Sequence, residues 1–125
     1  MIIKTKRFDR WARIAALTDA VLREAVDEMV NGLIDADLGG GVFKKRVALP
    51  GRGKSGSVRT LLATNRRDRW FFMFGFEKSD RTNISAKELE ALQGLAGDLL
   101  SLKKEQIRRA IHDGTFLEVL NEKAK

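Results

Sequence analysis

The feature of this sequence that most constrains its fold is the apolar run at residues 70–76. The run reads Trp-Phe-Phe-Met-Phe-Gly-Phe, with no polar side chain in it. A strand that alternates polar and apolar residues covers one face of a sheet, whereas an unbroken apolar strand is usually buried on both faces. We therefore expect 70–76 to form a central strand, with its aromatic side chains in the core.

Shorter extended segments precede this run and predict its neighbours in the sheet. Residues 42–49 and 57–64 are rich in β-branched and apolar side chains, which favours strands. Pro50 and a glycine-rich loop separate the two segments. Ile2, Ile3 and Thr5 indicate a further short strand at the N-terminus.

Two helices are predicted between the first strand and the others. Phe8 begins a series of apolar residues at helical spacing, and Thr18 is placed to cap a second helix. The apolar stripe of the second helix runs on to Leu33. We expect this helix to end near Asp37 and Leu38, where the three glycines 39–41 stop it.

The C-terminal third reads as helical. Ser85 and Glu88 form the S-x-x-E pattern of a capping box, and an apolar stripe follows to residue 100. Ser101 is expected to cap another short helix that ends at Asp113 and Gly114. Residues 115–120 are expected to add a short strand, and the tail from residue 121 is expected to fray.

The predicted order is β-α-α-β-β-β followed by helices. It indicates an α+β fold with a small, mostly antiparallel sheet, two N-terminal helices and a C-terminal helical extension from about residue 85. We expect residues 1–125 to form a single domain, because the length suits one domain and 43% of the residues are hydrophobic.

The charge is concentrated in the middle of the chain. The protein has 24 Lys and Arg against 17 Asp and Glu, a formal net charge of +7. Residues 44–81 contain eleven basic and three acidic residues, or +8, so the rest of the chain carries −1. A solvated basic face without a partner is possible, but this concentration favours a site for phosphate groups.

The composition excludes several classes of function. The chain has no Cys, which rules out disulfides, thiol catalysis and cysteine-bound zinc. His112 is the single histidine, so a site with two histidine ligands is ruled out too. The N-terminus has no apolar signal segment and no run approaches the roughly 20 residues of a membrane span. We expect a soluble cytoplasmic protein with no membrane partner, no metal and no cofactor.

A phosphate-loop pattern at residues 48–55 is misleading. The segment reads Ala-Leu-Pro-Gly-Arg-Gly-Lys-Ser, but Ala48 stands where the stricter pattern has glycine. Such a loop should open a helix whose N-terminus faces the phosphates, yet the residues that follow are strand-like. A nucleotide-hydrolysing site is therefore not expected, although a basic, glycine-rich loop suits a phosphodiester.

The predicted strands gather basic side chains at one edge. Lys44 and Arg46 share a strand face because alternate residues point the same way, whereas Lys45 faces the other side. If the three central strands are neighbours, the cluster contains Lys44, Arg46, Lys54, Arg59, Lys78 and Arg81.

This inventory permits RNA cleavage by a simple route. RNA supplies its own 2′-OH as the nucleophile, so the protein must orient it, stabilise the phosphorane and move protons. Arg59 is the natural clamp for the developing charge, and a lysine could act as acid or base. The aromatic run could instead stack on bases, but it places no polar residue on one face, so the core remains the favoured interpretation.

Three segments together resemble a known family. They are 43–47 (FKKRV), 53–56 (GKSG) with Arg59, and 75–84 (GFEKSDRTNI). With the 33–41 stretch (LIDADLGGG), they resemble the RelE/HigB-type toxins of bacterial toxin–antitoxin systems. The resemblance covers roughly residues 8–100.

The resemblance implies a compact β-α-α-β-β-β fold and an mRNA interferase, a metal-independent endoribonuclease that cleaves mRNA in the ribosomal A site. It also implies a co-encoded antitoxin, usually a helix-turn-helix DNA-binding protein. The positions that match the family's catalytic cations are Lys44, Arg46, Arg59, Lys78 and Arg81. Further RNA-binding residues are expected at Lys45, Arg52, Lys54, Arg66 and Arg67.

The chain departs from the family pattern in three respects. It contains no Tyr, so the C-terminal tyrosine of some members is missing. It adds the basic loop 52–54 and a C-terminal extension. These departures affect the assignment of proton transfer more than the fold or the RNA partner.

Two other functions compete with RNA cleavage. The related ParE-type toxins share the fold but poison DNA gyrase, and they tend to lack clustered basic residues on the strands. Lys44, Arg46 and Arg59 argue against that class. The second alternative is a nucleic-acid-binding or regulatory module without catalytic activity.

Overall fold

A computed structural model describes residues 1–49, 51 and 56–120 of the chain. The strands are β1 (Ile2–Thr5), β2 (Ala36–Gly39), β3 (Val42–Val47), β4 (Val58–Thr64), β5 (Trp70–Glu77) and β6 (Phe116–Glu118). The helices are α1 (Lys6–Ile14), α2 (Asp19–Val30), α3 (Ala86–Leu100) and α4 (Lys104–His112).

The strands form one open, mixed sheet in the order β2-β3-β4-β5-β1-β6. Among the strands of the described residues, β1 and β5 run parallel and the other neighbouring pairs are antiparallel. The predicted α+β fold with a mostly antiparallel sheet is confirmed. β5 lies between β4 and β1 and six of its eight residues are buried, so the prediction of a central strand is confirmed as well.

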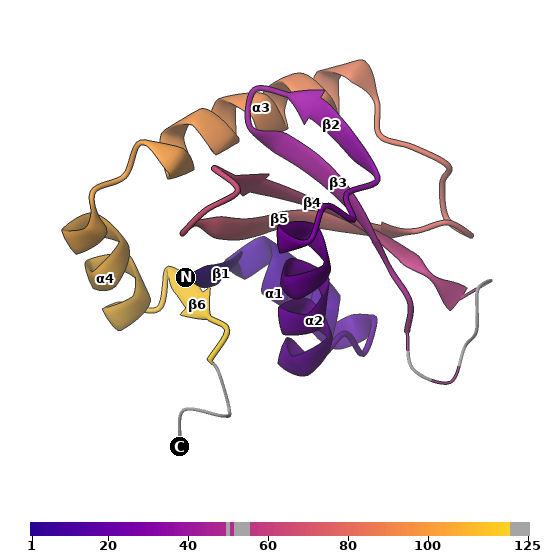
Figure 1. The fold of residues 1–125 in the computed structure, drawn as a ribbon, viewed down its shortest axis with the longest axis horizontal. Helices are drawn as coiled ribbons and strands as arrows, with labels where there is room; N and C mark the ends of the chain where they lie inside the picture. The colour runs from indigo at the N-terminus through magenta and orange to yellow at the C-terminus, as the bar shows by residue number, and fades with distance from the viewer. Residues whose placement is uncertain (50, 52–55, 121–125) are drawn as a thin grey trace.

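Helices cover both faces of the sheet, as Figure 1 shows, with α1 and α2 on one side and α3 on the other. Each side has its own hydrophobic cluster. The first joins Phe8 and Leu22 to Phe72 of β5, and the second joins Leu92 and Ala96 of α3 to the other side of the sheet. In the described ranges, no helix combines the length and apolarity that a membrane span requires.

The second helix is shorter than predicted. It ends at Val30, and residues 36–39, expected to complete it, form β2 instead and pair with β3. The cause is local: Asn31 caps the helix, and Gly32 follows with a φ of +92°, a left-handed conformation that terminates helices. Thr18 caps the start of the helix as predicted, since its hydroxyl accepts from Val21 N.

The predicted cap of α4 is also wrong. Ser101 is the C-cap of α3, and α4 begins three residues later, at Lys104. Lys103 occupies the N-cap position, and its backbone N–H donates to Gln106 Oε1. The capping box at the start of α3 is confirmed, because Ser85 and Glu88 exchange hydrogen bonds. The short C-terminal strand is confirmed as β6.

A β-bulge in β5 changes which side chains face α3. Leu61 pairs with Phe74 and Leu62 pairs with Phe72, so Met73 is an extra residue on β5. Phe72 therefore packs on the α1 side, whereas Phe74 and Phe76 both belong to the α3 side. The bulge therefore puts Phe74, together with Phe76, on the opposite face of the sheet from Phe72.

A buried ion network ties β1 to the first two helices. Lys4 Nζ lies 2.9 Å from Asp9 Oδ1 and 2.8 Å from Asp19 Oδ1. Burial opposes the charge on Lys4, but the hydrogen bonds to Asp19 and Asp9 outweigh it and raise the pKa of this ammonium group.

Candidate active site

Two arginines lie side by side where β3 and β4 pair. Arg46 is directly opposite Arg59, and Lys44 is opposite Leu61. Leu61 packs in the hydrophobic cluster on the α3 side of the sheet. Because alternate residues of a strand share a face, Lys44, Arg46 and Arg59 lie on this same side. Among the residues that the structure describes, none of the three forms an ion pair with a carboxylate. Like charges directly opposite one another are unfavourable in a sheet, which suits an anionic ligand.

Ser57 holds the guanidinium of Arg59. Arg59 Nη1 donates to Oγ of Ser57 over 2.9 Å, and Ser57 lies two residues earlier in the chain, immediately before β4. Ser57 is buried and Arg59 is half-buried, so the arginine has less freedom than an exposed side chain. A guanidinium fixed in this way retains N–H groups for a bidentate contact with phosphate oxygens.

Aromatic rings adjoin this pair of arginines. Arg59 pairs with Phe76 across β4 and β5, and the ring centroids of Phe74 and Phe76 lie 6.3 Å apart. Phe76 is buried and Phe74 is half-buried. The prediction that this run is core holds for most of β5, while Phe74 retains a partly open ring beside the cations.

Arg81 reaches the same rings from the loop after β5. Its Cζ atom lies 5.6 Å from the ring centroid of Phe74 and 5.8 Å from that of Phe76. Its guanidinium forms a bidentate pair with Glu88, at 2.5 Å and 2.9 Å. Sequence reasoning identified Glu88 as a capping residue only, and the ion pair with Arg81 was missed.

Glu88 connects the site to the start of α3. Its carboxylate accepts from both Arg81 and the backbone N–H of Ser85. These hydrogen bonds, the ones from Arg81 foremost, lower the pKa of Glu88 to about 2. The same ion pair raises the pKa of Arg81. The remaining predicted cation, Lys78, is exposed in the turn that follows β5.

The structure does not place Lys45 with the other cations. Lys45 is buried on the α2 side of the sheet, where its Nζ pairs with Glu28 at 2.8 Å and donates to Leu33 O. We therefore correct the expectation that Lys45 binds RNA, because its charge is already neutralised inside the protein. Alternation had placed this side chain on the other face, and that was the signal to exclude it.

Arg66 and Arg67, which were also predicted to bind RNA, do not join the cluster. Arg66 and Arg67 lie in the turn after β4, roughly 17 Å or more from Arg59, given the rise per residue of a strand. Arg66 lies over the ring of Phe43, which belongs to the α2 side. Arg52 and Lys54 lie outside the described residues. The described segment that follows them is β4, a strand as predicted.

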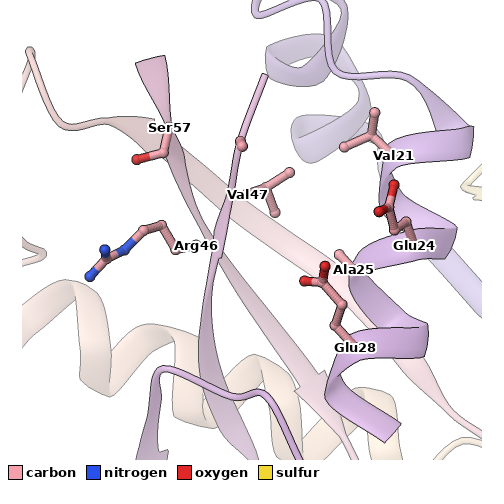
Figure 2. A pocket seen from close by; sticks show the side chains of 8 residues that line it. Val21, Glu24, Ala25, Glu28, Arg46, Val47 and Ser57 are labelled. Carbon is pink, nitrogen blue, oxygen red and sulfur yellow. The ribbon is translucent and has the colours of Figure 1, made fainter. Parts of the chain in front are cut away.

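A pocket of about 450 Å³ lies between α2 and the end of β3. Figure 2 shows Glu24 and Glu28 on its α2 wall, with Val47 directed toward them, whereas the Arg46 guanidinium extends away from α2. Carboxylates repel phosphate, so this pocket does not suit a phosphate ligand. The candidate site is the face that bears Arg46 and Arg59.

The fold and this face together define a class: a small α+β protein with a cluster of cations fit for a polyanion. A family model, the RelE toxin of the RelE/RelB toxin–antitoxin system, matches residues 1–119. The chain therefore belongs to the RelE toxin family, and it is a toxin of a toxin–antitoxin system with a cognate antitoxin as its partner. None of the curated proteins compared with the chain gives a significant match.

Proposed function

We propose that this toxin is an endoribonuclease that cleaves mRNA on the ribosome without a metal ion. The observation that supports the proposal best is the pair Arg46 and Arg59, directly opposite each other and without a carboxylate partner in the described part of the chain. Family membership supports the same function, since the resemblance of the sequence implies an mRNA interferase.

The proposed reaction uses the 2′-OH of the RNA. Its oxygen attacks the adjacent phosphorus while a base removes the proton. The bond from phosphorus to the 5′-oxygen breaks, and an acid protonates that oxygen as it leaves. The products are a 2′,3′-cyclic phosphate and a 5′-hydroxyl, so atoms and charge balance without any further reactant.

Each cation of the site has a role in this proposal. Arg59, fixed by Ser57, clamps the phosphorane oxygens, and Arg46 adds a second positive charge beside it. Arg81 stands over the neighbouring rings, with Glu88 fixing its position. Lys44 and Lys78 are the candidates for moving the protons, because both are lysines of the predicted catalytic set.

The ribosome is part of the proposal because this acid–base inventory is weak. The chain has no Tyr and no Cys, and its one histidine, His112, is the last residue of α4. Lysine and arginine have pKa values far above neutral pH and are poor bases there. An external surface that aligns the 2′-OH with the phosphorus would supply much of the missing rate enhancement.

We also propose that the antitoxin is a helix-turn-helix DNA-binding protein.

The test compares mRNA on ribosomes with the same RNA free in solution. Primer extension should map new 5′ ends within translated codons after wild-type protein is added to programmed ribosomes, and few ends on free RNA. The same ends should appear in cells that express the protein. Binding without new ends would support the non-catalytic alternative, and growth arrest with intact mRNA and inhibited gyrase would support the ParE-type alternative.

A further inference from the structure

Arg7 reaches the candidate site from outside the basic segment 44–81. It lies in the first turn of α1, and its Cζ atom is 5.0 Å from the ring centroid of Phe74. The same ring has the Cζ atom of Arg81 at 5.6 Å. Two guanidinium groups from distant parts of the chain therefore meet at one half-buried ring.

The rings connect Arg7 to Arg59. Phe74 contacts Phe76, and Phe76 pairs with Arg59 across the sheet. Phe74 and Phe76 belong to the cluster on the α3 side, and Arg59 shares the strand face of Leu61 in that cluster. Arg7 extends from the first turn of α1 to the ring of Phe74. A strand of RNA could therefore pass from Arg59 along the two rings to Arg7.

Of the two guanidinium groups at Phe74, that of Arg7 is more accessible to a phosphate than that of Arg81. Arg81 is neutralised by its bidentate pair with Glu88. Arg7 is exposed, and within residues 1–49, 51 and 56–120 it forms no ion pair with a carboxylate. A stacked guanidinium keeps its N–H groups at the ring's edge free to bind phosphate oxygens.

We propose that Arg7 is a further RNA-binding residue, which binds a phosphate of the single strand beside the one held by Arg59. The inference rests on the proposed function, because it takes the substrate to be RNA. It assigns Arg7 to binding and not to the chemical step, since the two rings separate it from Arg59.

The test measures the salt dependence of binding to a short single-stranded RNA whose 2′-OH groups are methylated, so that it cannot be cut. Each phosphate contact contributes about 0.7 to the slope of log K against log salt for single strands. Arg7→Ala should reduce the slope by about that amount and weaken binding severalfold at low salt. Arg7→Lys should keep the wild-type slope, because it keeps the charge.

The matched control is the variant Arg108→Ala. Arg108 is an exposed residue of α4, and Figure 1 shows α4 at the opposite end of the molecule from the C-terminal end of β3. It removes the same charge and should leave the slope unchanged. If Arg7→Ala fails to fold, Arg7→Gln keeps a side chain over Phe74 and serves instead. Three results would overturn the proposal for Arg7. They are an unchanged slope in the folded Arg7 variant, an equal reduction of the slope in Arg108→Ala, and no binding of the RNA by the wild type. Failure of the proposed function is a separate result: intact mRNA on ribosomes treated with wild-type protein.

Discussion

Arg59 is the residue on which the proposed chemistry depends most. The Ser57 hydroxyl holds it on β4, and Arg46 stands opposite. We expect Arg59→Ala to reduce the cleavage rate on programmed ribosomes about 100-fold or more, the scale for losing one preorganised contact to the transition state. Arg59→Lys should restore little of the rate, because a point charge does not replace a fork of N–H donors.

Arg66→Ala is the matched control for this prediction. Arg66 carries the same charge at the other end of β4, over Phe43 on the opposite face. Its loss should weaken RNA binding modestly, chiefly at low salt. A fully toxic Arg59→Ala protein together with an inactive, folded Arg66→Ala protein would place the active site elsewhere.

The lowered pKa of Glu88 predicts how the stability of the protein depends on pH. Its pKa of about 2 in the folded protein lies below the ordinary 4.5, so the unfolded chain binds more protons between these values. The contribution of Glu88 to stability is present above pH 4.5 and is lost as the pH falls through 2. The melting temperature of Glu88→Gln should therefore change less between pH 5.5 and pH 2.5 than that of the wild type. Glu90→Gln, an exposed neighbour on α3, should behave as the wild type does, and equal pH dependence in all three proteins would refute the role of Glu88.

At the scale of elements, β5 divides into a core part and a site part. Phe72 is fully buried and packs on Phe8, whereas Phe74 is half-buried beneath Arg7 and Arg81. Phe72→Ala should cost about 3–5 kcal/mol of the free energy of unfolding, measured by urea denaturation. Phe74→Ala should cost less and should weaken RNA binding. Equal stability of the two variants and the wild type would contradict the assignment of Phe72 to the core.

The packing of α1 on β5 depends on Gly75. A Cβ atom at this position would lie 2.2 Å from Cζ3 of Trp11, so the indole must move to admit even alanine. Gly75→Ala should destabilise the protein by about 1–3 kcal/mol. Gly94→Ala is the control: this α3 glycine has nothing within 4 Å of its Cβ position, and alanine there should stabilise by about 0.5–1 kcal/mol. A stable Gly75→Ala protein would show that Trp11 relocates at no cost.

Local signals predicted most elements but not their registers. Thr18 and the Ser85–Glu88 pair marked the starts of two helices, because side-chain caps act within one turn. The end of α2 is also determined locally, by Asn31 and Gly32, but the three later glycines predict an end several residues too late. The bulge at Met73 depends on pairing with β4, and an unbroken apolar run carries no sign of it.

At the scale of the whole molecule, strand alternation was a better guide to which cations share a face than the concentration of charge along the chain. Period-two alternation placed Lys44 and Arg46 on one face, and Arg59 joins them there. The concentration of positive charge was a poorer guide, since Lys45 pairs with Glu28 and Arg69 donates to Leu100 O and Leu102 O at the end of α3. Arg7 was missed because only the tertiary fold brings α1 next to Phe74.

The central claim is that this face cleaves mRNA only with the help of the ribosome. The most direct measurement is the single-turnover cleavage rate of one mRNA, bound to programmed ribosomes or free, at equal enzyme concentration. We predict rapid appearance of new 5′ ends on the ribosome, little cleavage of the free RNA, and loss of the ribosomal reaction in folded Arg59→Ala protein. Equally efficient cleavage of free RNA, or an Arg59→Ala protein that cuts as fast as the wild type, would contradict the account.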